Sequence, residues 1–212
     1  MSTKIGIISD PHATPGPVED ALSIFQQKGV EYIFCAGDIA GYGEGLDETV
    51  DLLRENDCIG VIGNHEAWYL DSATEKEKTD TYRYLNNLPV SLKMTIEGKE
   101  LYMVHASPPN SLIDGIKLLD EQGEPLEEQM DYWTRRLQGF THDVLVVGHT
   151  HQVFATRLAG TLVINSGSTL CNHSCAVASF PELDVELFAL SGQPLLKSWN
   201  WGMQRPGGHN KR

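Results

Sequence analysis

The first third of the chain alternates short apolar runs with amphipathic segments. Three apolar runs have the length of buried strands: residues 4–9, 32–36 and 58–62. The two segments between them, residues 17–28 and 46–56, repeat apolar side chains at helical spacing. This β-α-β-α-β order is typical of a parallel sheet with right-handed crossovers, because each helix returns the chain to the edge where the next strand begins.

The rest of the chain predicts a different arrangement. Residues 66–87 are polar with scattered aromatic side chains and predict a helical segment, which Pro89 ends. Beyond it, apolar and polar positions alternate as they do in half-buried strands, and turn residues join the strands into hairpins. The paired ranges are 92–96 with 101–104, 153–157 with 162–165, and 175–180 with 184–190. Together the patterns predict an α/β fold with mixed sheets.

The length of 212 residues suits one hydrophobic core, so we expect a single domain over residues 1–204. Residues 106–142 are its least regular part and contain one amphipathic helix, marked by Leu126, Met130, Trp133 and Leu137. This insertion is either a lid that contacts the substrate or a plain crossover helix. Residues 205–212 have no apolar pattern and predict a mobile tail.

The formal net charge of −13 argues against general binding to nucleic acid or to an anionic membrane, since both depend on cationic side chains. A small phosphate-ester substrate stays possible, because bound divalent cations would make a site locally positive. No apolar run reaches membrane-spanning length and the N-terminus shows no signal-like segment, so the cytoplasm is the expected compartment.

Two smaller features leave alternatives open. The four cysteines (Cys35, Cys58, Cys171 and Cys175) lie in apolar segments and are interpreted as reduced structural thiols, with a disulfide or metal site at Cys171 and Cys175 as the alternative. Trp199 and Trp201 are expected to be exposed, and they either support a homodimer or cover the sheet.

Polar side chains with metal-binding chemistry follow five of the apolar runs. These residues are Asp10 and His12, Asp38, Asn64 with His65, His105, and His149 with His151. If the runs are strands of one sheet system, their C-terminal ends bring the groups to a common edge. Satisfied histidines and turn residues are the usual explanation for any one of them, but that explanation would have to hold at five successive strand ends.

The donor set predicts a centre of two metal ions. Imidazoles, carboxylates and an amide suit Mn, Fe, Zn, Co or Ni better than calcium or magnesium. One ion takes about four to six ligands, whereas the candidate ligands, without His65, number seven. Two divalent ions that share a bridging carboxylate use all of them, and Asp38 is the central carboxylate in chain order.

The same groups resemble, in order and spacing, the five motif blocks of the calcineurin-like metallophosphoesterases. The blocks read Asp10-Pro11-His12, Gly37-Asp38, Gly63-Asn64-His65-Glu66, His105 and Gly148-His149-Thr150-His151. The short chain and the sequence of residues 37–43 are most similar to the small bacterial and archaeal phosphodiesterase-like branch. The resemblance implies a four-layer αββα sandwich with a dinuclear site at the strand ends.

The resemblance also implies roles for individual residues. Asp10, His12 and His151 would hold the first metal. Asn64, His105 and His149 would hold the second, and Asp38 would bridge the two. Mn is the first expectation for the metal. A metal-bridging hydroxide would attack phosphorus in line. His65, which like Asp38 and Asn64 is assigned to catalysis, would stabilise developing charge or protonate the leaving oxygen without binding metal. Glu66 would orient His65 or a ligand.

The implied activity is hydrolysis of phosphate esters, with phosphodiesters favoured. Hydrolysis of dinucleoside polyphosphates or phosphomonoesters is an alternative, as is a non-catalytic scaffold, since the resemblance extends to the retromer subunit on this fold. A scaffold has no need for the five imidazoles of the motifs. No arginine follows Gly37-Asp38, which disfavours the serine/threonine phosphatase branch, and His142, His173 and His209 match no motif. His173 is either a substrate contact or a solvent-facing residue.

Overall fold

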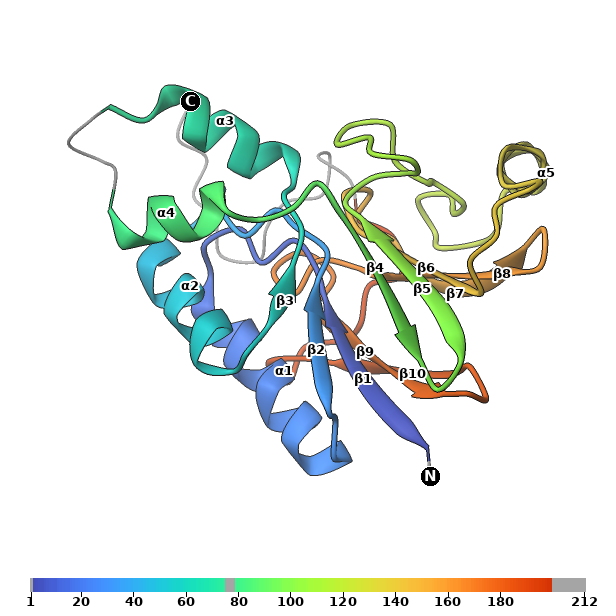
Figure 1. The fold of residues 1–212 in the computed structure, drawn as a ribbon, viewed down its shortest axis with the longest axis horizontal. Coiled ribbons are helices and arrows are strands. Elements are labelled where there is room, and N and C mark those ends of the chain that lie inside the picture. Colours follow the sequence, from blue (N-terminus) through green and yellow to red (C-terminus); the bar gives the residue numbers. More distant parts are fainter. Residues whose placement is uncertain (1, 75–78, 200–212) are drawn as a thin grey trace.

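The computed structural model describes residues 2–74 and 79–199, and in it two five-stranded sheets pack face to face between helical layers (Figure 1). The first sheet has the order β10-β9-β1-β2-β3. Its strands are β1 (Thr3–Ile8), β2 (Tyr32–Cys35), β3 (Ile59–Gly60), β9 (Ser174–Phe180) and β10 (Asp184–Ala189). Strands β1, β2 and β3 run parallel, as predicted, while β9 pairs antiparallel with both β1 and β10.

The second sheet has the order β4-β5-β6-β8-β7. Its strands are β4 (Ser91–Ile96), β5 (Lys99–Val104), β6 (Val144–Val147), β7 (Val153–Leu158) and β8 (Thr161–Ser166). The hairpins β4-β5 and β7-β8 are antiparallel, whereas β6 is parallel to both β5 and β8. Both sheets are therefore mixed, which confirms the predicted fold class.

The core lies between the two sheets. Because side chains alternate along a strand, Ile5 and Ile7 of β1 point into this layer, where Met103 and Val146 of the second sheet also lie, all four fully buried. Each such side chain contributes about 1.5–3 kcal/mol by leaving water. The alternate residue of β1, Ile8, faces the opposite side and packs in the cluster beneath the helices.

The helices form the outer layers and complete the four-layer αββα sandwich. They are α1 (Pro15–Lys28), α2 (Leu46–Glu55), α3 (Asn64–Ser72), α4 (Asp80–Asn86) and α5 (Glu127–Arg136). The first four contribute apolar side chains to the cluster on the outer face of the first sheet. Helix α5 covers the second sheet through Trp133, together with Ile116 and Leu118 from the irregular chain before it (Figure 1). The insertion therefore contains the predicted helix.

Several boundaries differ from the predictions. Helix α1 begins at Pro15, two residues before the predicted start at Pro17. Both prolines fit the first turn, because backbone N–H groups have no helical partner there. Strand β3 has only two residues, since the N–H of Ile62 already bonds to Pro89 outside the sheet. In place of the one helical segment predicted over residues 66–87, the described residues contain two helices, α3 and α4, and α3 ends where Ala73 becomes extended.

The prediction for Trp199 is wrong. Its side chain is buried, because the indole lies against His151 with ring centroids 5.3 Å apart. Trp201 and the predicted tail, residues 205–212, lie outside the described residues. All four cysteines are free thiols, so Cys171 and Cys175 do not form a disulfide.

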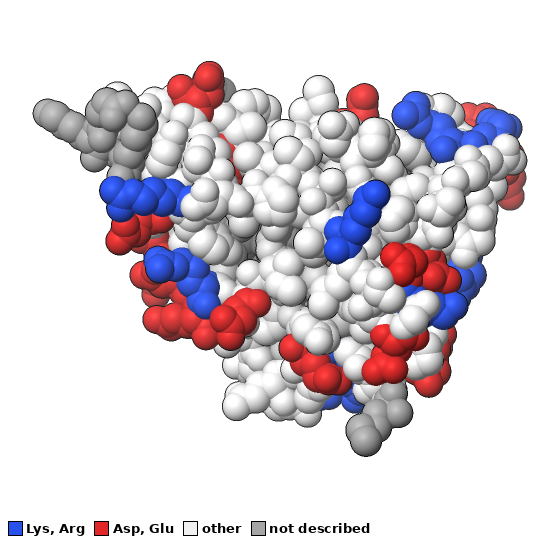
Figure 2. Space-filling model, in the orientation of Figure 1, with Lys and Arg blue, Asp and Glu red and all other residues white. Residues whose placement is uncertain are grey.

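The surface reflects the acidic composition. Figure 2 shows one face, on which acidic side chains gather along the lower edge and the flanks, with Lys and Arg scattered among them. Among the described residues, no helix combines the length and the apolar character needed to cross a membrane.

Candidate metal centre

The predicted ligands lie at one edge of the two sheets. Asp10 and Asp38 follow β1 and β2, His105 follows β5, and Asn64 opens α3. The loops are tied together by backbone bonds, from the N–H of Asp10 to Gly37 (2.9 Å) and from Gly148 to His105 (2.7 Å). The edge is therefore built by segments far apart in sequence, as the strand-end pattern predicts.

Asp10, His12 and His151 form one cluster of donor atoms. The distance from His151 Nε2 to Asp10 Oδ1 is 3.4 Å, and that from His12 Nε2 to His151 Nε2 is 3.1 Å. One oxygen or nitrogen from each residue lies within 4.8 Å of the others. All three side chains are buried.

Asp38, His105 and His149 form a second cluster of the same dimensions. His105 Nε2 lies 3.3 Å from Asp38 Oδ2 and 3.1 Å from Asn64 Oδ1. Asp38 also belongs to a third cluster with His12 and His65. The carboxylate of Asp38 thus lies between the two ligand groups, and the donor set fits divalent cations in both.

Backbone carbonyls orient the imidazoles. The Nδ1 atoms of His12 and His105 donate to the carbonyls of Ala40 (3.2 Å) and Ala36 (2.7 Å), so each Nε2 is the atom that can bind a metal ion once it carries no proton. Such a second hydrogen bond is what holds metal-binding histidines in the required tautomer. Burial lowers the pKa of His149, against the effect of the nearby backbone of Ile113.

The charges of the two clusters depend on each other. Burial alone would lower the pKa of His105, but the charge of Asp38 and its hydrogen bond raise it to about 9. In the same way, Asp10 raises the pKa of His151 to about 10 against the effect of burial. Asp10 and Asp38 have lowered pKa values because these imidazolium groups outweigh their burial. Without metal, the carboxylates therefore hold protons on the imidazoles.

Glu66 supports the backbone at the site. Its buried carboxylate accepts hydrogen bonds from the N–H groups of Asp38 (2.8 Å), Ala40 (2.6 Å) and Gly63 (2.7 Å). The N–H of His65 donates to Asp38 Oδ1 at 2.9 Å. Burial, and then the charge of Asp38, raise the pKa of Glu66 to about 7, although the N–H donors oppose the shift. Glu66 thus positions the backbone of a predicted ligand and has no bond to the His65 ring.

The backbone is strained where the predicted ligands sit. Five of them have positive φ angles: Asp10 (51°), His12 (47°), Asp38 (53°), His149 (66°) and His151 (48°). This region is uncommon for residues other than glycine and costs of order 1 kcal/mol or more each. Strain of this kind persists where the surrounding structure holds it in place, and it is concentrated at functional sites.

Glycines allow the loops to approach each other closely. A Cβ atom on Gly63 would lie 2.2 Å from Asp38 Oδ1, and one on Gly148 would lie 1.9 Å from Ser9 Oγ. Ser9 in turn donates a hydrogen bond to Asp10. The glycines that precede Asn64 and His149 are therefore required by contacts from other strands.

His65 lies beside the clusters, in contact with Tyr42. The Tyr42 hydroxyl is 3.0 Å from His65 Nε2, and burial lowers the pKa of the imidazole. The His65 ring also packs against the rings of His12 and Trp68, with centroids 4.8 and 4.9 Å apart. The sequence predicted no role for Tyr42, although Tyr42 lies within the motif of residues 37–43.

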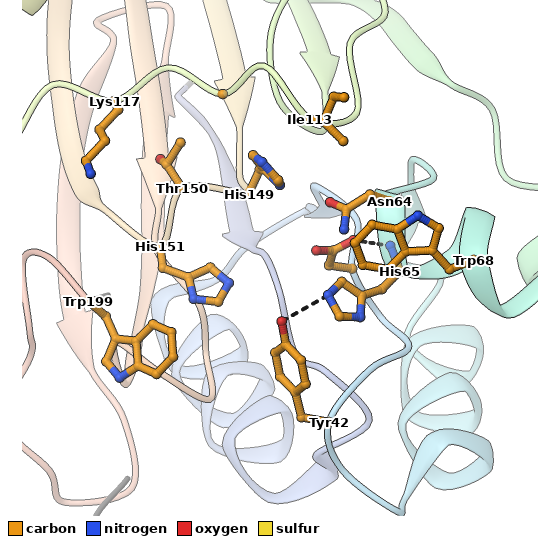
Figure 3. Close-up of a pocket in the computed structure, with 12 residues that line it drawn as sticks. Tyr42, Asn64, His65, Trp68, Ile113, Lys117, His149, Thr150, His151 and Trp199 are labelled. Carbon is orange, nitrogen blue, oxygen red and sulfur yellow. Dashed lines mark hydrogen bonds between the residues drawn. The ribbon is translucent and has the colours of Figure 1, made fainter. Parts of the chain in front are cut away.

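A pocket of about 560 Å³ opens over the centre (Figure 3). Besides the predicted site residues and Tyr42 and Trp199, the pocket is lined by four side chains for which the sequence predicted no role of their own: Trp68, Ile113, Lys117 and Thr150. Ile113 and Lys117 belong to the predicted insertion. His142 and His173 do not line it, and His209 lies outside the described residues. Thr150 lies within the Gly148-His149-Thr150-His151 block, but no local pattern marks Trp68, Ile113 or Lys117, because these positions follow no strand end and match no motif.

Comparisons with known proteins agree with this geometry. Residues 3–185 match the model of the calcineurin-like phosphoesterase superfamily domain. The uncharacterized protein MJ0912 of Methanocaldococcus jannaschii is 27% identical over 183 residues, which cover 79% of this chain and 70% of that protein. Phosphodiesterase MJ0936 of the same organism is 23% identical over 183 residues, covering 86% and 93%.

A solved structure shows the same fold. The metallophosphoesterase from Sphaerobacter thermophilus superposes with a TM-score of 0.67 at 23% identity, covering 89% of each chain. The family match spans most of the chain, including every predicted site residue. The chain therefore belongs to the calcineurin-like phosphoesterase superfamily and is a phosphoesterase.

Proposed function

We propose that the protein hydrolyses phosphodiesters at a centre of two divalent metal ions, most readily manganese. The observation that supports this best is the position of the pocket over the ligand clusters, four of whose members line it: Asp38, Asn64, His149 and His151. Trp68 and Ile113 lie to one side of His149, and Lys117 and Trp199 lie to the other (Figure 3). A phosphorus atom over the clusters would have room for an ester arm on each side, whereas a monoester would use only one.

The ligand residues would divide between two cations in the same way as they divide between the two clusters. Asp10, His12 and His151 would hold one cation, Asn64, His105 and His149 the other, and Asp38 would contact both. When bound, two such cations lower the pKa of a water molecule and neutralise charge on the phosphate oxygens.

His65 is the proposed donor to the leaving oxygen. Its imidazole faces the pocket, and the Tyr42 hydroxyl at 3.0 Å holds the ring by Nε2. The backbone bond from His65 to Asp38 fixes the ring relative to the clusters. A hydrogen bond from this imidazole would offset the negative charge that develops as the ester bond breaks.

A non-catalytic scaffold remains the alternative function. Against it stand the buried imidazoles and the strained ligand backbones, which a protein-binding surface does not require. Relatives support the phosphodiester preference as well, since MJ0936 is named as a phosphodiesterase.

Hydrolysis of two aryl esters tests the proposal. Chelator-stripped protein receives bis(4-nitrophenyl) phosphate or 4-nitrophenyl phosphate, with and without Mn²⁺. We expect Mn²⁺ to restore turnover, with kcat/KM higher for the diester. Asn64→Ala and His65→Ala should each lose at least about a hundredfold, while Asn56→Ala, at the exposed end of α2, should match the wild type. Folded protein without turnover on any divalent metal would favour the scaffold.

A further inference from the structure

The pocket contains the two most exposed large apolar side chains among the described residues. The exposed fraction is 66% for Ile113 and 59% for Trp68, and the next, Val90, reaches 44%. Single exposed apolar residues are ordinary on a protein surface. Two exposed apolar residues in one pocket beside the ligand clusters are less ordinary, because a ligand bound there would remove both side chains from water.

Both side chains are tied to the metal centre. Trp68 lies three residues after His65 on α3, so their side chains share one face of the helix, and their ring centroids are 4.9 Å apart. Ile113 belongs to the chain between β5 and α5, which lies against His149, since a Cβ atom on Gly115 would come within 2.8 Å of the His149 ring. Trp68 and Ile113, which form two walls of the pocket, are thus held in place relative to the metal centre.

The shape and chemistry of the walls indicate a flat ring system. An indole face opposite an aliphatic side chain suits a purine, pyrimidine or similar ring, because stacking on Trp is strong and tolerates different bases. In Figure 3, Trp68 and Ile113 lie on the same side as Asn64 and His65, whereas Lys117 lies on the opposite side. Lys117 is the one Lys or Arg among the described residues that line the pocket.

We infer that the substrate is a small nucleotide ester, with its base between Trp68 and Ile113 and a further anionic group toward Lys117. The inference rests on the proposed function for the position of the phosphorus. Because the base lies on the side of His65, the nucleoside would be the leaving arm: water adds to phosphorus, the phosphorus–oxygen bond to the nucleoside breaks, and the nucleoside oxygen takes a proton. The net charge of −13 fits a small ligand better than a long nucleic acid.

Equilibrium binding tests the base site without requiring turnover. Calorimetry on the Mn²⁺-loaded protein compares adenosine 5′-monophosphate with ribose 5-phosphate, which lacks the base. We expect the nucleotide to bind roughly tenfold more tightly. Trp68→Ala should bring this ratio close to one, Trp68→Phe should largely keep it, and Tyr132→Ala, an exposed aromatic on α5, should leave it unchanged.

The outcomes separate this inference from the proposed function. Equal affinity for the two ligands in the wild type, or a ratio unaffected by Trp68→Ala, would overturn the base site even if aryl diesters are hydrolysed. A retained ratio without hydrolysis would instead overturn the proposed function alone. Lys117→Ala should weaken adenosine diphosphate roughly fivefold relative to the monophosphate, and an equal effect on both would remove Lys117 from the inference.

Discussion

The Nε2 atoms of His12 and His151 lie 3.1 Å apart inside the protein, with Asp10 Oδ1 at 3.4 Å from the latter. Two imidazole lone pairs at this distance repel each other unless a proton or a cation lies between them. The carboxylate raises the pKa of His151 to about 10, whereas burial lowers that of His12 to about 4. In the metal-free protein the proton therefore resides on His151.

This relationship predicts that metal binding releases protons. At pH 7 both His105 and His151 are protonated in the metal-free protein, because their pKa values are about 9 and 10. Metal needs both rings neutral, so we expect release of about two protons when the centre fills with Mn²⁺. Calorimetric titration in buffers of different ionisation enthalpy measures the number. His151→Ala should lower it by about one, and a buffer-independent enthalpy would contradict the prediction.

Stability of the metal-free protein should fall as the pH rises from about 6.5 through 9. The folded state raises the pKa of His105 from 6.5 to about 9, so the charged pair with Asp38 stabilises the fold fully below pH 6.5 and is lost above pH 9. The loss is on the order of 3 kcal/mol. Urea unfolding after chelator treatment measures it. His105→Gln should lose this part of the pH dependence and keep the part due to His151, whose pKa is raised to about 10. An unchanged pH dependence in His105→Gln would show that His105 does not cause it.

Replacing Glu66 by Gln should destabilise the protein by about 2 kcal/mol. The carboxylate accepts three backbone N–H bonds, whereas an amide places a donor against one of them. The loops after β2 and β3 would separate, so Mn²⁺ affinity should fall as well. Urea unfolding and metal titration measure the two effects. Glu128→Gln, at an exposed position of α5, is the matched control, and an unchanged midpoint for Glu66→Gln would refute the prediction.

Gly63→Ala should inactivate the protein. The new Cβ would lie 2.2 Å from Asp38 Oδ1 and 2.4 Å from the Asp38 backbone N, so the carboxylate and the backbone of Asp38 must both leave their positions between the two clusters. We expect diester hydrolysis to fall at least about a hundredfold. Gly16→Ala, in α1 with no atom near its Cβ, should keep wild-type activity. Near-normal turnover in Gly63→Ala would mean that Asp38 need not hold its present position.

Tyr42→Phe should lower kcat for the aryl diester roughly tenfold with little change in KM. The substitution removes the hydroxyl that bonds to His65 Nε2 but keeps the ring that packs on His12. Steady-state kinetics with Mn²⁺ measures both constants. Tyr82→Phe, on α4, serves as the control. A rise in KM at constant kcat would show that Tyr42 binds substrate instead of holding the imidazole.

The sequence by itself determined the strands, the fold class and the set of metal-binding candidates. Local patterns suffice for these features. Buried strands such as β1 and β6 need apolar runs of a definite length, and parallel strands present the residues after them at one edge. Because Asp10, Asp38 and His105 each follow a strand, the sequence alone predicts them at this edge.

Only the tertiary structure decided which strands are neighbours and which further side chains reach the site. That β9 joins β1, and that β8 lies between β6 and β7, depends on packing between distant segments. The same is true of the contact of Tyr42 with His65 and of the close approach of Gly115 to His149. Burial of Trp199, predicted as exposed, follows from its contact with His151. Such contacts leave no periodic signal in the sequence around either residue, because they depend on how distant segments pack and not on local spacing.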